Sequence, residues 1–316
     1  MPRKQTVTQR QWLIVKITIS AALLSWLISV IDTQAVLSHL TVLDPLYLLA
    51  VFAISISGLF ISTEKWRLLL ISIEQKPSFF ALLRLFWIGA FFNNFFPGRT
   101  GGDVVRAYGV ARHTQDKTPA TLTVVVDRVL NLIALLGIAL IAIIWSPQVL
   151  PESMRDYSLM VILILCGMGL FGIGLFWIIS KKVTRLNSIV LFVKTLAQKP
   201  IHMTVAIGLA FLYQTTMILS NYIIALGLGL KLSPSIFFIV IPLTALATMV
   251  PISLNGWGLR EGAYALSFQT FGVAPELAIT LSVVAALCMI GVSSIGGLFY
   301  ISQNVDISLT SKPSIP

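Results

Sequence analysis

The sequence predicts an all-α polytopic membrane protein, on three observations. Of its 316 residues, 57% are hydrophobic and only 11% are charged, which is too apolar for a soluble domain of this length. The mean hydropathy is +0.91. Apolar runs of about 20 residues, the length that crosses roughly 30 Å of hydrocarbon, recur along the chain. We therefore expect a single transmembrane domain over residues 1–316.

The chain divides into eight apolar segments separated by polar or helix-breaking residues. We expect them at 12–31, 45–62, 79–96, 118–146, 157–180, 201–228, 235–250 and 275–301. The first is long and lacks a small-residue cleavage site, so it is expected to stay in the membrane. The second is expected to end at residue 62, where charged residues begin. The third stops at Pro97, because proline and the glycines after it break the helix.

The later segments follow the same logic. The fourth and eighth are long enough to span fully. The fifth is followed by a basic, partly amphipathic stretch, 181–200, which leads into the sixth. The seventh is broken at Pro251, and a glycine-rich piece then enters a short helix at 259–271. The tail, 302–316, is short and polar.

One local pattern occurs twice, at the two breaks. In FFPGRTGGDVVRAYG, Pro97 is followed after five residues by Gly102 and after nine by Arg106. The segment VPISLNGWGLREGAY repeats this spacing from Pro251 to Arg260. Each copy interrupts a long apolar stretch and ends on an arginine. Interrupted helices are typical of membrane transporters, which bind their cargo at the breaks.

The distribution of positive charge favours re-entrant segments, since lysine and arginine gather in cytoplasmic loops. If 79–96 crossed the membrane fully, the basic residues around the first break and those of 181–200 would lie outside. If 79–96 instead enters from the cytoplasm and returns, both groups lie inside. We therefore expect six full spans and two re-entrant segments in the cytoplasmic membrane, with both termini cytoplasmic. Eight full crossings are the alternative.

The same reasoning makes 235–250 re-entrant from the outer side. The two halves, about 45–146 and about 200–301, then match with opposite orientation, which predicts an inverted repeat. The net charge of +10 follows the positive-inside rule, so we expect membrane lipids rather than nucleic acid as partners. A homo-oligomer, or a complex with an envelope-biosynthesis enzyme, is also open.

Two arginine-bearing motifs that approach the middle of the membrane from opposite sides predict an anion site. A guanidinium donates two parallel hydrogen bonds to phosphate, and glycine-rich turns add backbone N–H donors. We expect substrate binding by Arg106, Arg260, Arg99, Asn94, Gly101, Gly102, Asn255 and Gly256. We expect Asp103, Asp127, Arg128, Asn131 and Glu261 to order the site or couple it to protons. Two structural alternatives stay open: an internal Asp127–Arg128 ion pair, and glycines that merely permit tight turns.

Signatures of enzymes, metals and cofactors are scarce. The histidines and cysteines lie apart without metal-ligand spacing, and the sequence contains no P-loop. We therefore expect no metal, no cofactor and no catalytic site, and we expect translocation of an anionic or phosphate-linked lipid. The alternatives are a membrane-embedded transferase acting on a lipid phosphate and a non-transporting scaffold for an envelope enzyme.

Three segments carry a resemblance to a known family: NNFFPGRTGGDVVRAY, TLTVVVDRVLNLIALL and PISLNGWGLREGAYAL. They resemble the flippase-like family, which comprises the transmembrane region of lysylphosphatidylglycerol synthases and its stand-alone relatives. The resemblance extends from about Trp12 to Tyr300. In the synthases this region is implied to move the aminoacylated lipid between leaflets, while a separate soluble domain makes that lipid. The resemblance therefore implies a lipid flippase and not an aminoacyltransferase, with phospholipids or polyprenyl-phosphate glycans as cargo.

Overall fold

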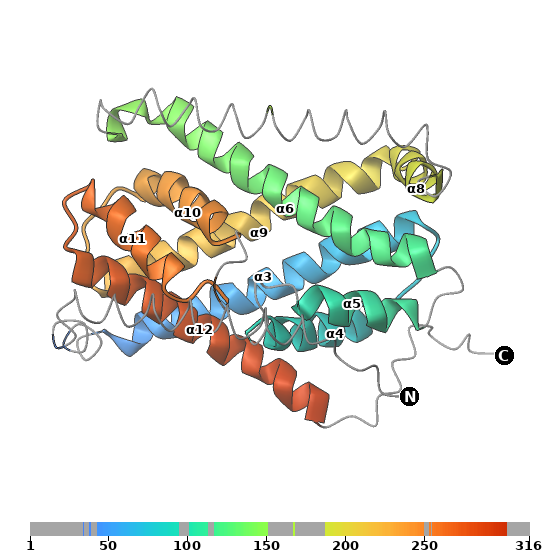
Figure 1. Cartoon of the computed structure of the whole chain (residues 1–316), viewed down its shortest axis with the longest axis horizontal. Helices are drawn as coiled ribbons and strands as arrows, with labels where there is room; N and C mark the ends of the chain where they lie inside the picture. The colour runs from blue at the N-terminus through green and yellow to red at the C-terminus, as the bar shows by residue number, and fades with distance from the viewer. Residues whose placement is uncertain are drawn as a thin grey trace, which may run out of the picture.

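The structure is a computed structural model. It describes residues 34, 38, 43–94, 101–112, 117–150, 167, 187–249, 253 and 255–301. These residues form nine α-helices and one 3-10 turn: α3 (Pro45–Ser72), α4 (Phe79–Asn93), α5 (Gly101–Ala111), α6 (Lys117–Trp145), η1 (Pro147–Val149), α8 (Asn187–Ala197), α9 (Pro200–Gly227), α10 (Pro234–Met249), α11 (Leu259–Gln269) and α12 (Pro275–Ile301). The all-α prediction is confirmed over this part of the chain (Figure 1). The expected helix 12–31, and 157–180 apart from Gly167, lie outside it.

Four of the described helices are long and apolar enough to cross a membrane. These are α3, α6, α9 and α12, each with 27 or 28 residues in its apolar stretch. At 1.5 Å per residue, such a helix is about 40 Å long. The apolar helices α4 and α10 have 15 and 16 residues. Their length of about 23 Å falls short of the hydrocarbon core. The protein is therefore a multi-pass membrane protein with both long and short apolar helices.

Prolines start several of these helices. Pro45, Pro200, Pro234 and Pro275 are the first residues of α3, α9, α10 and α12. Proline fits the first helical position because its missing N–H would have no intrahelical acceptor there. At α3, the carboxylate of Asp44 also accepts a hydrogen bond of 2.8 Å from the Leu46 N–H. These prolines explain why the sequence located the starts of these helices closely.

The predicted end of the second helix, at residue 62, was wrong. Helix α3 continues to Ser72, so the charged group after residue 62 lies inside a membrane-length helix. Trp66, Leu69 and Leu70 are fully buried, and they extend the helix's packed face by another two turns. Lys65 is also fully buried and is paired with a carboxylate, so its charge does not end the helix.

The order and contacts of the helices in the first half recur in the second. Helices α3 and α9 each have 28 residues, α5 and α11 each have 11, and α3 packs along α9. Helix α4 packs on α12 as α10 packs on α6, and α5 packs on α6 as α11 packs on α12. The short pairs α4–α5 and α10–α11 lie toward opposite ends of the long axis of the molecule (Figure 1). The long helices therefore form a shared framework with one short pair at each end.

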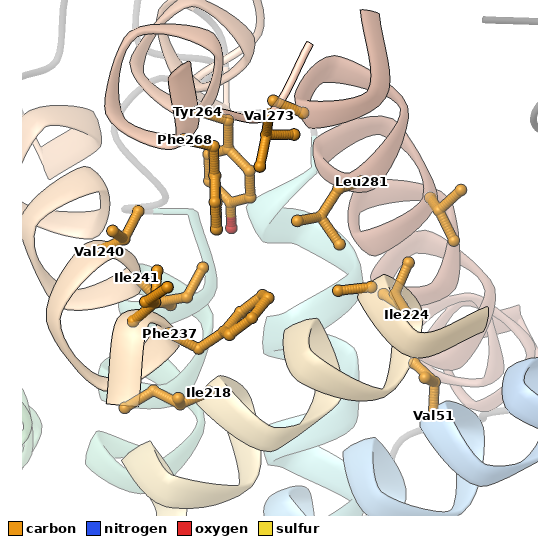
Figure 2. Packing of buried hydrophobic residues seen from close by; sticks show 14 of the residues in the cluster. Val51, Ile218, Ile224, Phe237, Val240, Ile241, Tyr264, Phe268, Val273 and Leu281 are labelled. Carbon is orange, nitrogen blue, oxygen red and sulfur yellow. The ribbon is translucent and has the colours of Figure 1, made fainter. Parts of the chain in front are cut away.

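Two large apolar cores hold the helices together, and each draws most of its residues from one half of the chain. One core gathers side chains from α9, α10, α11 and α12 with one each from α3 and α6. Figure 2 labels ten of its residues: Val51, Ile218, Ile224, Phe237, Val240, Ile241, Tyr264, Phe268, Val273 and Leu281. A second large core joins α3, α4, α5, α6 and α9 through Trp66, Leu69, Leu70, Leu82, Leu85, Val110, Val124, Leu130, Ala206 and Ala210. The short helices thus pack into the framework on apolar surfaces.

Helix α4 is held between two glycine contacts. A Cβ at Gly296 of α12 would lie 2.0 Å from the carbonyl oxygen of Trp87, and a Cβ at Gly102 of α5 would lie 2.4 Å from that of Gly89. The Trp87 indole also donates a hydrogen bond of 2.9 Å to the Val292 carbonyl. Any other residue at Gly296 or Gly102 would push these backbones apart. The α4–α5 pair is therefore fixed closely to α12.

Candidate functional site

Five alternately charged side chains form a row through the first half of the molecule. Asp103 contacts the Nε of Arg128 and accepts a hydrogen bond of 2.6 Å from Nη2 of Arg106. Nη1 of Arg106 lies 3.0 Å from Oδ2 of Asp127. The ammonium of Lys65 lies 3.0 Å from Oδ1 of Asp127 and forms a second ion pair with this carboxylate. We call these five residues the charge ladder.

Exposure falls steadily along the charge ladder. The exposed fraction of the side chain is 44% for Arg128, 20% for Asp103, 8% for Arg106, 1% for Asp127 and zero for Lys65. Three helices contribute, α6, α5 and α3, so the ladder runs from the surface of the bundle into its interior. One end can therefore meet a ligand while the other is enclosed by protein.

Lys65 is the member of the ladder that sequence reasoning missed. It was read as part of a charged helix end, yet it is fully buried and donates a hydrogen bond to the amide oxygen of Asn131. The ring of Tyr213 lies 5.6 Å from the ammonium, and Gln214 donates to the Asn131 carbonyl at 2.8 Å. The apolar sequence that follows Lys65 was the available signal, because it shows that the helix continues.

Arg106 packs against two aromatic rings as well as two carboxylates. Its guanidinium carbon lies 4.5 Å from the ring centre of Phe86 and 5.2 Å from that of Trp66. The Trp66 indole donates a hydrogen bond of 3.0 Å to the Thr123 hydroxyl, which fixes the ring. Cation–π contacts stabilise a guanidinium most where water is excluded. Arg106 is therefore held in one place, between α3, α4 and α6.

The charge ladder carries an excess of positive charge. It contains three cations and two carboxylates among the described residues, and three of the five, Lys65, Asp127 and Arg128, lie on the membrane-length helices α3 and α6. A charge at the centre of a bilayer costs about 3 kcal/mol on insertion scales. An excess cation in such a place attracts an anion strongly, because the surroundings screen it weakly.

The second motif, around Arg260, has different contacts from the charge ladder around Arg106. Nη2 of Arg260 donates to Oε1 of Glu261 at 2.6 Å, and its Nε donates to the Ser282 hydroxyl at 3.0 Å. Trp257 lies over the guanidinium, 5.1 Å from ring centre to carbon. The other oxygen of Glu261 accepts the Gly258 N–H at 2.6 Å and caps α11. This motif is electrically balanced, and Ser282 contacts Arg260 from α12 as Asp127 contacts Arg106 from α6.

The turn before α11 needs left-handed backbone. Asn255, Gly256 and Gly258 have φ values of +49°, +82° and +81°. Glycine adopts this region freely and asparagine tolerates it better than other residues. The glycines of the motif therefore serve the turn directly, whatever else they do.

The two motifs approach each other at a pair of asparagines. The side-chain nitrogen of Asn255 lies 3.5 Å from the side-chain oxygen of Asn94, and Asn94 donates to the Ser293 hydroxyl at 2.7 Å. Asn93 accepts the Gly102 N–H at 2.7 Å. Arg106 and Arg260 have no partner in common among the contacts that the structure describes. The motifs thus meet through amides and not through their arginines.

The predicted site residues therefore fall into two groups. Asn131, Asp103, Asp127, Arg106 and Arg128 gather at the charge ladder, with Gly101 and Gly102 in the first turn of α5. Arg260, Glu261, Gly256 and Asn255 gather at the second motif, with Asn94 beside it. The described ion pairs do not join Asp127 to Arg128. Asp127 pairs with Lys65 and Arg106, and Arg128 pairs with Asp103. Arg99 lies outside the described residues, and within them no cluster of His, Cys, Asp or Glu can hold a metal.

Comparison with known proteins identifies the family. The family described as "Lysylphosphatidylglycerol synthase TM region" matches residues 13–297, which is most of the chain and includes both motifs. No curated protein and no solved structure matches significantly. The chain belongs to the family of the lysylphosphatidylglycerol synthase transmembrane region, a flippase-like membrane family.

Proposed function

We propose that the protein moves an anionic phospholipid, or another lipid that carries phosphate, between the leaflets of the cytoplasmic membrane. One observation carries the proposal: among the described residues, the charge ladder has three cations to two carboxylates, and Lys65 and Asp127 are buried within helices of membrane length. Family membership supports it, because the family is flippase-like. A lipid phosphate supplies the negative charge that the ladder lacks.

A purely structural ladder is a weaker explanation. Replacing buried ion pairs by packed apolar side chains is often neutral or stabilising, so folding alone does not require them. An excess cation adds a cost that packing does not repay. Charged residues within membrane spans mark binding sites or ion paths more often than they serve stability. The ladder therefore favours a ligand of opposite charge.

In the proposed mechanism, Arg106 and Arg260 hold the phosphate at successive stages. Asp103 and Glu261 neutralise these arginines while no cargo is bound, as their 2.6 Å contacts allow. We further propose that α4 and α10 are re-entrant and that the halves form an inverted repeat. Their short lengths, the recurring helix contacts and the opposite ends occupied by α4–α5 and α10–α11 support this arrangement (Figure 1). Rocking of one half against the other would then change access.

The proposal is tested with the full chain in phosphatidylcholine vesicles that contain a fluorescent phosphatidylglycerol or, in a second preparation, a fluorescent polyprenyl phosphate. A membrane-impermeant quencher reports the fraction of label in the outer leaflet. We expect protein-dependent exchange of at least one phosphate lipid and no exchange of a labelled diacylglycerol. If neither phosphate lipid moves faster than in protein-free vesicles, the proposal fails.

Mass spectrometry of the same vesicles separates the other functions. A transporter changes the leaflet of the lipid without changing its mass. A membrane-embedded transferase makes a product of new mass when a soluble donor is supplied. A scaffold for an envelope enzyme does neither alone. We therefore expect movement with the lipid mass unchanged.

A further inference from the structure

We propose that Arg128 is the residue that first binds the lipid phosphate, and that the phosphate reaches Arg106 by displacing the carboxylate of Asp103. The inference deepens the proposed function and rests on it. It assigns to Arg128 a contact with cargo, beyond the ordering of the site. It also makes Asp103 an internal anion that occupies the binding place until the lipid arrives.

The position of Arg128 in α6 is unusual for an exposed charge. It lies eleven residues after the first residue of a 29-residue helix, which is about 16 Å along the helix axis. Nevertheless 44% of its side chain is exposed. A guanidinium facing hydrocarbon at that depth costs about 3 kcal/mol or more. Such exposure is tolerable where water or a lipid headgroup reaches the side chain, so the surface around Arg128 is suited to a headgroup.

Exposed apolar residues lie on α6 and α5, the helices that carry Arg128 and its partner Asp103. Val125 and Val129 of α6 are 54% and 42% exposed, and Val125 shares a helix face with Arg128 because the two are three residues apart. On α5, which packs against α6, Val104 and Tyr108 are 67% and 65% exposed. An exposed cation on helices that also carry exposed apolar side chains matches an amphiphile, with its phosphate on the guanidinium and its acyl chains on the valines.

Asp103 links this surface to the buried part of the ladder. One carboxylate oxygen contacts Arg128 and the other contacts Arg106, so the carboxylate lies between an exposed and a buried guanidinium. A phosphodiester carries one negative charge, as the carboxylate does. Exchange of one for the other leaves the charge between the two arginines unchanged. Handover from Arg128 to Arg106 therefore buries no additional net charge.

The roles predict different kinetic defects for the two arginines. The test measures initial exchange rates of fluorescent phosphatidylglycerol at increasing mole fraction in phosphatidylcholine vesicles. We expect Arg128→Gln to raise the half-saturating mole fraction at least about tenfold, which corresponds to one lost charged hydrogen bond, with the maximal rate kept. Arg106→Gln should instead lower the maximal rate. Arg128→Lys, which retains the charge, should recover part of the apparent affinity.

A matched control comes from Arg84, another exposed arginine, which lies on α4 over the ring of Phe299 and outside the ladder. Arg84→Gln should change neither parameter. A half-saturating fraction for Arg128→Gln equal to that of Arg84→Gln would overturn the inference. So would a lowered maximal rate with unchanged half-saturation, because that pattern indicates a purely structural role.

Two further measurements complete the test. One distinguishes a lipid from free phosphate as the ligand, and the other distinguishes failure of this inference from failure of the proposed function. Inorganic phosphate at millimolar concentration should leave exchange unchanged, because it has no acyl chains to contact the exposed apolar residues of α5 and α6. Strong inhibition by it would identify free phosphate as the ligand and overturn the lipid assignment. A wild-type chain that moves no labelled lipid contradicts the proposed function itself. Normal wild-type exchange with an unaffected Arg128→Gln variant contradicts this inference alone.

Discussion

The side-chain nitrogen of Asn255 lies 3.5 Å from the side-chain oxygen of Asn94, although 161 residues separate them in sequence. Asn94 caps the C-terminal end of α4, and Asn255 begins the turn that leads into α11. Each belongs to one copy of the repeated motif. Movement of either short helix pair therefore strains or breaks a contact with the other, which gives the two motifs a direct physical link.

Substitution of Asn255 separates its contact from its backbone role. Asn255→Gly keeps the left-handed turn but removes the amide, whereas Asn255→Ala removes both. We expect both variants to slow lipid exchange, and only the alanine variant to lose about 1 kcal/mol of stability through backbone strain. Thermal unfolding in detergent and the vesicle assay measure the two effects. Full exchange activity in Asn255→Gly would show that the amide contact is dispensable.

Removal of Lys65 should destabilise the protein. Lys65→Met leaves the buried carboxylate of Asp127 with Arg106 alone, and breaking one side of a buried ion pair costs about 3–5 kcal/mol. The double variant Lys65→Met/Asp127→Leu removes both charges and should regain much of this stability without regaining lipid exchange. Thermal unfolding measures the stability of the two variants, and the vesicle assay measures their lipid exchange. If Lys65→Met were as stable as wild type, the ion pair with Lys65 would not be required to stabilise the buried Asp127 carboxylate.

The glycine contact between α4 and α12 should tolerate no side chain. Gly296→Ala places a Cβ 2.0 Å from the Trp87 carbonyl oxygen, and overpacking of this kind costs about 1–3 kcal/mol. Gly208→Ala on α9 is the matched control, because nothing lies within 4 Å of a Cβ there. The control should be neutral or slightly stabilising, since alanine favours helix. Equal midpoints of thermal unfolding for the two variants would argue against the close α4–α12 packing.

Arginine at position 106 should not be replaceable by lysine. A guanidinium reaches Asp103 and Asp127 at once through two nitrogens, and an ammonium cannot reproduce that fork. We expect Arg106→Lys to lower the maximal rate of lipid exchange at least about tenfold, with Arg84→Lys as the unaffected control. Wild-type rates in Arg106→Lys would indicate that only its charge matters.

The sequence predicted most helices closely because apolar runs and flanking prolines define them. The expected 118–146, 201–228 and 275–301 correspond to α6, α9 and α12 within one residue at each end. The end of α3 was missed although apolar residues follow Lys65, because a charged residue usually marks the membrane surface. Only the fold reveals that Asp127 compensates Lys65.

The candidate site was predictable in its local parts only. Asp103 and Arg106 are three residues apart on one helix, so their contact follows from helix geometry. The contact between Lys65 and Asp127 joins α3 to α6 and depends on how the two helices pack. Likewise, the sequence grouped Arg106 with Arg260 by motif, while the structure gives each a separate set of carboxylates. Tertiary packing, and not motif similarity, decides these partners.

Native mass spectrometry of the purified full chain tests most directly whether the charge ladder binds a phosphate lipid. Wild-type protein released from mild detergent should carry adducts whose masses match phosphate-bearing lipids. The same adducts should be largely lost from Arg128→Gln and kept in Arg84→Gln. Wild-type protein that carries only neutral lipids, or adducts equally abundant in Arg128→Gln, would contradict the account.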